Sequence, residues 1–369
     1  MIKKNRFIIF YILLVILCIG IYLFTCNNHS FYKKDLAKVV DIEERYDTTR
    51  EASFGYKDKY YIQTITLEIL NNEYQGEKIV VENEYDDGLA FYEKYEKNEV
   101  LFVDLNYTSS KKLQGTIEGI KRDKYFVLIT IIFILTIILV GKLKGLLAIL
   151  GLIINLIVFV IAVNLNTTGT GLVIALSISS IIFTVTGLLL ASGLNKCTLA
   201  SIISSILGLL ITLGIALLVF YFSKGEGIRF DQMELLTRPY KSIFICELMI
   251  GGLGAIMDIS ITITSAFKEL INKNNKITSK DLIKSGIEIG KDVTGTMINV
   301  LFFTYICGVL PTLVILFRNG IPIYELRTQY ISLELVRALT GAIGITLTIP
   351  IAIATSIFIL RRKQKWLVF

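Results

Sequence analysis

Histidine, proline and charged residues are all scarce in this sequence. His29 is the only histidine among 369 residues, so a metal site built from histidines is excluded. The five cysteines are scattered and no two of them form a Cys-x-x-Cys pair, which leaves no basis for a zinc site or a disulfide framework. The sequence therefore predicts no bound metal and no cofactor.

Residues that could carry catalysis are also few. A Ser–His pair cannot form within the apolar part of the chain, because His29 lies outside it. Intramembrane proteolysis by aspartates requires two facing aspartates, usually with one directly after Gly-x-Gly, but Ala255 follows Gly254 here. The run 286–292 resembles a phosphate-binding loop, yet it is one residue short and has no Ser or Thr after Lys291. We therefore predict that the protein is not an enzyme.

What the chain has instead is apolar sequence. Hydrophobic residues make up 53% of it and charged residues 19%, and the mean hydropathy is +0.64. These values are typical of proteins that cross a membrane several times. A net charge of +7 can indicate a nucleic-acid partner, but in a membrane protein it reflects cationic loops kept in the cytoplasm. We therefore expect a lipid bilayer around the protein and no nucleic acid.

Composition divides the chain into three parts. Residues 1–26 begin with a basic segment and continue with an apolar run, Phe7–Thr25. Because no small-residue cleavage pattern follows this run, a retained membrane anchor is favoured over a signal peptide. Residues 27–124 are polar and rich in Tyr, Lys and Glu, whereas residues 125–369 are almost wholly apolar.

The polar part, residues 27–124, shows the patterns of β-strands. Apolar and polar residues alternate over Ile65–Ile69 and Leu101–Leu105, and short β-branched runs occur at 38–40 and 79–81. Turn residues follow at 71–72 and 74–76. This predicts a small all-β module, either a barrel or a sandwich, outside the cytoplasm. The module could bind a protein partner or a ligand, or it could be a passive cap, and the sequence favours neither.

The apolar part predicts seven transmembrane helices and, with the anchor, about eight. The predicted spans are 125–141, 145–165, 171–191, 198–222, 242–266, 294–317 and 332–360. The fold class is thus an α-helical polytopic membrane protein with an N-terminal extracytoplasmic all-β module. In the one sizeable cytoplasmic loop, 267–293, Thr278 or Ser279 could cap a short helix. That helix could lie against anionic lipid, or the loop could be an ordinary connector.

Lysine and arginine orient the predicted spans. If the N-terminus is inside, the cytoplasmic segments carry more of these residues than the short outer loops do. This distribution places both termini in the cytoplasm and residues 27–124 outside it. Three cations on the outer side, Lys121, Arg122 and Lys124, do not fit this pattern, although long translocated domains largely escape the rule.

The span 242–266 carries two carboxylates. Its polar and small residues fall on one stripe of a helix, formed by Glu247, Gly251, Gly254, Asp258 and Ser265. A charge at the centre of a spanning helix costs about 2.5–3.5 kcal/mol, so we expect neighbouring helices to cover Asp258. The glycines allow another helix to approach closely. This helix is therefore predicted to be the centre of a helical bundle.

Polar residues of neighbouring spans predict an outer layer at the depth of Glu247. Arg337 lies at a similar depth in the last span, and Glu334 is one turn nearer the surface. An ion pair between Glu247 and Arg337 could hold two helices in register, and we favour this structural role over a direct functional one.

An inner layer is predicted around Asp258. Asn299 lies at a similar depth in the next span, and Asp292 lies just outside the membrane. No cation is expected at this depth, so Asp258 is the best candidate for a carboxylate that binds a proton or a cation. A protonated carboxyl group that hydrogen-bonds between helices would explain it equally well.

Three stretches of the chain resemble the YibE/F-like family of bacterial membrane proteins. They are GGLGAIMDISITITSA (251–266), SG-x-x-IGKDVTGTMIN (285–299) and ELVRALTGAIGI-x-L-x-IP (334–350), and the resemblance extends over roughly 38–360. The chain departs from the family at Lys291, where arginine is expected, and at 293–294, where a bulkier apolar pair is usual. The resemblance implies a multi-pass protein of the bacterial plasma membrane, and it implies no established activity.

The sequence leaves two functions open. The first is a permease or channel that moves a proton, a cation or a small solute, and its candidate path is Glu247, Gly251, Gly254, Asp258, Asp292 and Asn299. The second is a membrane assembly or scaffold protein that does not transport, whose outer β-module recruits an extracytoplasmic protein partner. The solute or ion remains unidentified in the first case, and the partner in the second.

Overall fold

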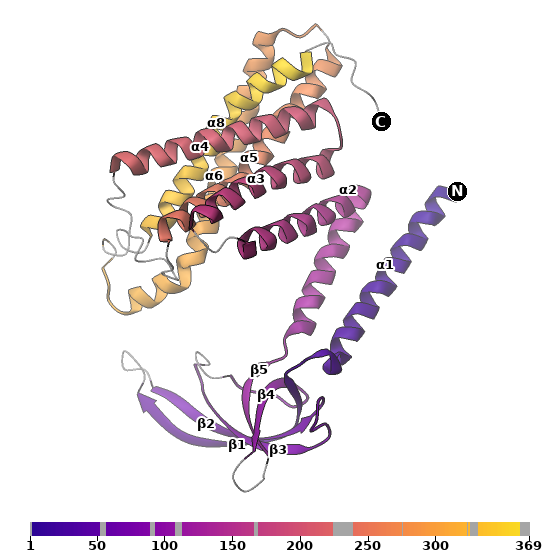
Figure 1. Ribbon diagram of the computed structural model, residues 1–369, viewed down its shortest axis with the longest axis vertical. Helices are drawn as coiled ribbons and strands as arrows, with labels where there is room; N and C mark the ends of the chain where they lie inside the picture. The colour runs from indigo at the N-terminus through magenta and orange to yellow at the C-terminus, as the bar shows by residue number, and fades with distance from the viewer. Residues whose placement is uncertain are drawn as a thin grey trace. The chain divides into compact units, whose positions relative to one another are not determined.

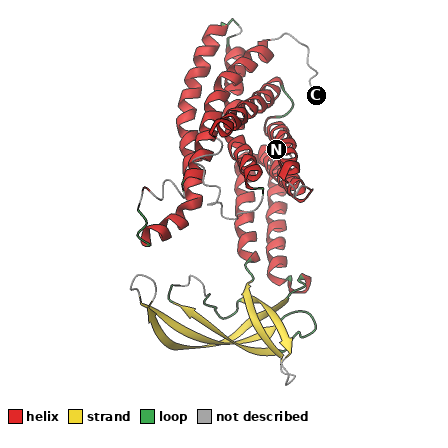
Figure 2. Cartoon of the chain, turned by 60° about the vertical axis from the view of Figure 1, so that its left-hand side comes forward, coloured by secondary structure: helices red, strands yellow, loops and turns green. Residues whose placement is uncertain are grey.

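The computed structural model describes residues 2–51, 57–88, 93–107, 113–165, 169–223, 239–274, 276–322, 324 and 331–361. The chain divides into two units, Met1–Leu139 and Val140–Phe369. The first unit contains all the described strands, and the second is helical (Figure 2).

The N-terminal unit contains a helix, an antiparallel sheet and the first part of a second long helix. Helix α1 covers Ile2–Asn27, and a 3₁₀ turn, η1, follows at His29–Phe31. The strands are β1 (Asp35–Glu51), β2 (Lys57–Ile69), β3 (Lys78–Asp86), β4 (Val100–Tyr107) and β5 (Leu113–Ile120). They form one five-stranded sheet in the order β3-β2-β1-β4-β5, with every neighbouring pair antiparallel (Figure 1). This sheet confirms the all-β character expected for residues 27–124, although β5 was not among the expected strands.

Alternation along the strands produces the core of the sheet. The register pairs Val39 with Leu67 and Ile65 with Val81, so that apolar side chains gather on one face. The buried core consists of Ala37, Val39, Ile65, Leu67, Ile69, Ile79, Tyr95, Leu101 and Val103. The expected turns are also present, because Asn72 and Gly76 have φ angles of 60° and 90°, in the left-handed region that these residue types tolerate.

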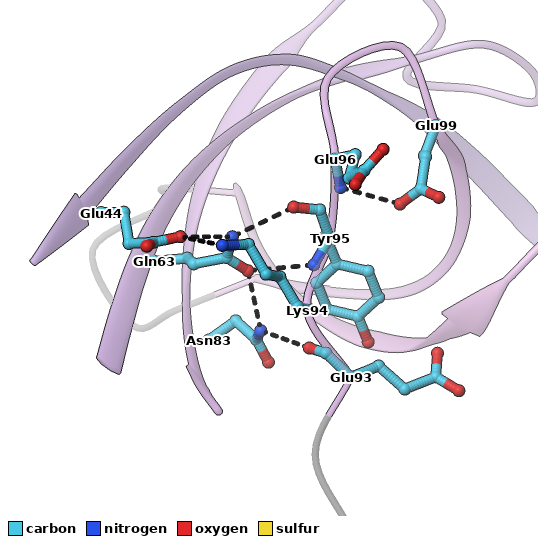
Figure 3. Close-up of polar contacts among 8 residues, drawn as sticks. All are labelled: Glu44, Gln63, Asn83, Glu93, Lys94, Tyr95, Glu96 and Glu99. Atoms are coloured by element: carbon cyan, nitrogen blue, oxygen red, sulfur yellow. Dashed lines mark hydrogen bonds and ion pairs between the residues drawn. The ribbon is translucent and has the colours of Figure 1, made fainter. Parts of the chain in front are cut away.

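Gln63 is the polar centre of this core. It is 1% exposed, and it exchanges two hydrogen bonds with the backbone of Tyr95 (Figure 3). Its Nε2 donates to the Tyr95 carbonyl oxygen at 3.0 Å, and its Oε1 accepts from the Tyr95 amide at 3.1 Å. Asn83 Nδ2 donates to the same Oε1 at 3.2 Å and to the carbonyl oxygen of Glu93 at 2.9 Å. These bonds hold the irregular segment 93–99 against β2 and β3.

Lys94 extends this network towards solvent. Its Nζ lies 3.0 Å from Glu44 Oε2 and 5.1 Å from the centre of the Tyr85 ring. Hydrogen bonds with Tyr85 and Glu44 hold the pKa of Lys94 above its usual range, and the hydrogen bond from Lys94 holds the pKa of Glu44 below its own. The pair is therefore ionised at neutral pH, but its exposure to water limits its contribution to stability.

Lys121 and Arg122 are two of the three cations on the expected outer side that do not fit the predicted charge distribution. Lys121 is 5% exposed; its Nζ donates to the Thr25 carbonyl oxygen at 2.9 Å and lies 2.8 Å from Asp123 Oδ2. Arg122 forms an ion pair with Glu93. Both cations are therefore engaged in contacts inside the N-terminal unit.

Six helices of the described chain are long and apolar enough to cross a membrane. They are α2 (Asp123–Leu165), α3 (Gly169–Ser192), α4 (Lys196–Ser223), α5 (Tyr240–Lys273), α6 (Ser279–Arg318) and α8 (Ser332–Arg361). With α1, the described residues form seven long helices, so the expected count of eight is not confirmed. The reason is that the predicted spans 125–141 and 145–165 both lie within α2, which is interrupted at Lys142, where φ is 51° and ψ is −127°.

The predicted loop 267–293 is mostly helical. Helix α5 continues to Lys273 and α6 already begins at Ser279, which leaves only a short connector. Thr278 is the N-cap of α6, as expected, and its hydroxyl accepts from the Asp281 amide at 3.2 Å. The first turns of α6 pack on the bundle, because a Cβ on Gly286 would lie 2.8 Å from both Phe267 and Ile353.

Helix α8 lies at the centre of the helical unit together with α5. Helix α8 packs against α4, α5 and α6, and small residues allow the close contacts. A Cβ added to Gly252 of α5 would lie 3.7 Å from the Cα of Gly341 of α8, and one added to Gly290 of α6 would lie 2.7 Å from Ile349 of α8. Helix α5, which was expected at the centre, packs against α3, α4, α6 and α8, so it shares this central place with α8.

We expect Gln63→Leu to loosen the segment 93–99. The substitution keeps the approximate size of the side chain but leaves the Tyr95 amide and carbonyl groups buried without their partner, at a cost of about 1–3 kcal/mol. Hydrogen–deuterium exchange of the full-length protein should become faster in this segment. Gln114→Leu, on an exposed position of β5, is the matched control. Unchanged protection in Gln63→Leu would show that these hydrogen bonds do not hold the segment.

Candidate functional site

The polar stripe predicted on α5 is present, and it forms the open face of that helix. Gly254, Asp258 and Ser265 are exposed, and Glu247 and Gly251 are partly exposed. The opposite face of α5 is buried and includes Phe244, Leu248, Ile256, Ile259 and Ile263. Burial of these large side chains fixes the rotation of α5, and Gly254, Asp258 and Ser265 consequently point away from the other helices of the unit.

Asp258 is not covered as expected. Its side chain is exposed, and it has no hydrogen-bond or ionic partner among the described residues. Asn299 and Asp292 are also exposed on α6, and no hydrogen bond within the described chain joins either of them to Asp258. Ser260, two residues after Asp258, is fully buried on the other side of α5. The expected inner layer therefore consists of separate polar groups on the open surface of α5 and α6.

The three residues of the expected outer layer do come together. Arg337 of α8 binds Glu334, one turn earlier in the same helix, through Nη1, and it binds Glu247 of α5 through Nη2. The guanidinium carbon lies 5.4 Å from the centre of the Phe244 ring. We call Glu247, Glu334 and Arg337 the acid–arginine cluster. It joins α5 to α8, and the side chains of Arg337 and Glu334 are only 15% and 13% exposed.

The acid–arginine cluster has an excess of acid. With both carboxyl groups ionised, two negative charges face one guanidinium, so the cluster has a net charge of −1. Glu247 is its accessible member, because its side chain is 37% exposed and borders the open stripe of α5. The negative charge left over at the accessible carboxylate of Glu247 can attract a further cation. The arrangement can therefore hold α5 against α8 and also bind a positive charge at Glu247.

Tyr305 of α6 belongs to the same site and was not anticipated. Its hydroxyl lies directly on Gly251, where an added Cβ would overlap it. Gly251 is one turn after Glu247, so Tyr305 brings α6 close to the acid–arginine cluster. The signal in the sequence was Gly251 itself, because a glycine on a polar stripe marks a close approach, but it could not identify the approaching side chain.

Metal binding is not suggested by the described residues, since no group of three His, Cys, Asp or Glu side chains among them could hold a metal ion.

Comparison with known protein families matches both parts of the chain. A family model described as YibE/F-like protein matches residues 129–362, and one described as YibE/F family N-terminal domain matches residues 30–120. No curated protein and no solved structure matches the chain. The second match ends with strand β5, and the first covers most of α2 and all the described helices that follow it.

Two alanine substitutions on the same helix test the close approach of Tyr305. Gly251→Ala places a methyl group where the Tyr305 hydroxyl lies, whereas a Cβ at Gly254 meets nothing within 4 Å. We expect Gly251→Ala to destabilise the helical unit by about 1–3 kcal/mol through overpacking. Gly254→Ala should be neutral or stabilising by up to about 1 kcal/mol. Thermal unfolding in one detergent compares them, and equal stability of the two variants would contradict the described packing of α6 on α5.

Proposed function

Since the chain belongs to the YibE/F-like family and has six helices that can cross a bilayer, we propose that it is a multi-pass permease or channel. It moves a proton, a cation or a small solute along the open face of α5. The path includes the accessible carboxylate of the acid–arginine cluster and continues past Gly254 to Asp258. Asn299 and Asp292 of α6 complete its cytoplasmic end. The protein binds no nucleic acid and catalyses no reaction in this proposal.

The proposed topology has eight crossings in the bacterial plasma membrane. The 43 residues of α2 would form about 65 Å of straight helix, which is roughly twice the thickness of the hydrocarbon core. Its interruption at Lys142 supports two crossings with a turn between them. Lys142 and Lys144 then lie in the cytoplasm together with both termini, and residues 27–124 lie outside.

The exposed carboxylate of Asp258 is the observation that carries the proposal. A charged side chain near the middle of a spanning helix costs about 2.5–3.5 kcal/mol when lipid surrounds it. Because the described helices leave Asp258 exposed, this face of α5 requires water or another protein next to it. Water along a polar, glycine-containing stripe is the environment of a permeation path.

Two acidic positions along one helix suit the transfer of a positive charge. Glu247 and Asp258 lie 11 residues apart, about 16 Å along the helix axis and about three turns, so they share a face. A cation or proton that moves from one to the other crosses about half of the hydrocarbon core. Movement of one charge through 100 mV is worth about 2.3 kcal/mol, which is sufficient to drive transport without ATP.

A scaffold function is the second candidate, and the N-terminal unit supports it. The sheet has its own apolar core and its own buried polar network around Gln63, so it has the features of a folded module rather than of a linker. Such a module could recruit an extracytoplasmic protein partner. The helices would then act as an anchor, and the exposed face of α5 would contact a membrane partner.

We expect Asp258→Asn to abolish flux in proteoliposomes. The amide keeps the size of the side chain but can no longer bind a proton or a cation through a negative charge. An imposed membrane potential with an entrapped pH-sensitive dye measures proton flux, and a panel of monovalent and divalent cations covers the alternatives. Glu288→Gln, an exposed carboxylate of α6 outside the path, is the control. Wild-type flux in a correctly folded Asp258→Asn variant would remove Asp258 from the mechanism.

Deletion of residues 27–122 distinguishes the two functions. A permease whose path lies in the helical unit should retain its flux after the deletion, because none of the path residues is removed. A scaffold should lose its extracytoplasmic partner, which crosslinking of whole cells can recover in a fixed stoichiometry from the complete chain. Loss of flux in a stably inserted deletion variant would contradict a path confined to the helices.

A further inference from the structure

A cavity of about 250 Å³ lies at one end of the helical unit, far along α5 from the acid–arginine cluster. Three helices contribute to it: the start of α4, the last turns of α5 and the end of α8. Its polar lining includes Lys196 and Asn195 beside α4 and Lys268 and Asn272 of α5. Ile271 and Leu360 form an apolar wall. No carboxylate belongs to this lining among the described residues.

The lining favours an anion. Two lysines bring two positive charges to a cavity of this size, and Lys268 has no ionic partner within the described chain. The start of α4 adds the partial positive charge of a helix N-terminus. Asn195 keeps this end in place, because its Oδ1 accepts from the Thr198 amide at 3.1 Å and its Nδ2 donates to the Ser192 carbonyl oxygen at 2.7 Å.

The floor of the cavity is rigid. Cys197 is 5% exposed, and its thiol donates to the carbonyl oxygen of Thr264 in α5 at 3.6 Å. One turn further along α4, the hydroxyl groups of Ser201 and Thr264 lie 2.5 Å apart, and both residues are fully buried. These contacts fix the start of α4 on α5, so the backbone positions that carry the two lysines are set before any ligand binds.

The position of the cavity matches the depth of lipid headgroups. Spanning helices begin and end at the membrane surface, and the cavity is formed where three of them do so. Lysines at this depth interact favourably with anionic lipids, and the apolar wall of Ile271 and Leu360 can contact the glycerol and the first carbons of an acyl chain.

We propose that this cavity binds a phosphate group, either the phosphodiester of an anionic lipid headgroup or a soluble phosphate compound. Lys196 and Lys268 pair with the phosphate oxygens, and Asn272 donates a hydrogen bond to them. The proposal does not depend on transport, because the cavity lies outside the proposed path, and it applies equally to a permease and to a scaffold.

Native mass spectrometry of the full-length protein in detergent tests the proposal. The protein is incubated with phosphatidylglycerol, with zwitterionic phosphatidylcholine of the same acyl chains, and, in a separate arm, with glycerol phosphate. We expect phosphatidylglycerol to be retained selectively by the wild type. The Lys196→Gln, Lys268→Gln double variant should lose on the order of tenfold or more in binding, because it loses both cations near the phosphate.

Two further variants make the outcome decisive. Lys273→Gln with Lys276→Gln removes two charges at the same end of α5, outside the lining, and should bind like the wild type. Asn272→Asp places a carboxylate in the cavity and should abolish binding without removing a lysine. Selective retention of glycerol phosphate alone would assign the cavity to a soluble phosphate. Equal retention of phosphatidylglycerol by the wild type and by the Lys196→Gln, Lys268→Gln variant would overturn the proposal.

Discussion

The ionic contact of Arg337 with Glu247 and Glu334 constrains the whole helical unit. Arg337 is largely buried, so its guanidinium depends on these carboxylates as charge partners, and the contact favours one rotation and depth of α5 against α8. In that arrangement Gly252 of α5 faces Gly341 of α8, and the backbones approach closely. Because α8 also packs on α4 and α6, the position of each of these helices depends on the same contact.

The same rotation leaves a polar surface open. With Glu247 directed to Arg337 and the large apolar residues of α5 buried against other helices, Gly254 and Asp258 point away from the unit. A bilayer does not accept an isolated carboxylate, so this surface determines what surrounds the protein: water, for a path, or protein, for an assembly. In a permease, water lies against this face of α5, whereas in a scaffold a partner protein covers it.

Buried polar groups specify the N-terminal unit in a comparable way. Gln63 satisfies both hydrogen-bonding groups of Tyr95, and Lys121 connects the end of α1 to the start of α2 through Thr25 and Asp123. An apolar core alone would hold the sheet together, but it would not determine where the irregular segment 93–99 lies. The positive charge of Lys121 is thus a folding feature, although by position alone it looked like a misplaced orientation signal.

Local patterns in the sequence were sufficient for the elements whose cause is local. Period-two alternation identified the core strands, the residues at 71–76 identified the turn, and Thr278 identified the start of α6. Runs of apolar residues identified the helices that are long and apolar enough to cross a membrane, because hydropathy depends only on composition. Strand β5 escaped notice since Gly115 and Gly119 weaken its pattern. The spans predicted at 125–141 and 145–165 correspond to the two parts of α2 on either side of Lys142, where the helix is interrupted. The grouping of Glu247, Glu334 and Arg337 could also be inferred, because depth in a membrane follows from position along a helix. Only the tertiary structure decided that α8 shares the central place with α5, that Tyr305 lies on Gly251 and that Asp258 faces outward. These features depend on how each helix is rotated about its own axis. Packing between segments that are distant in the sequence sets this rotation, so the local sequence pattern does not predict it.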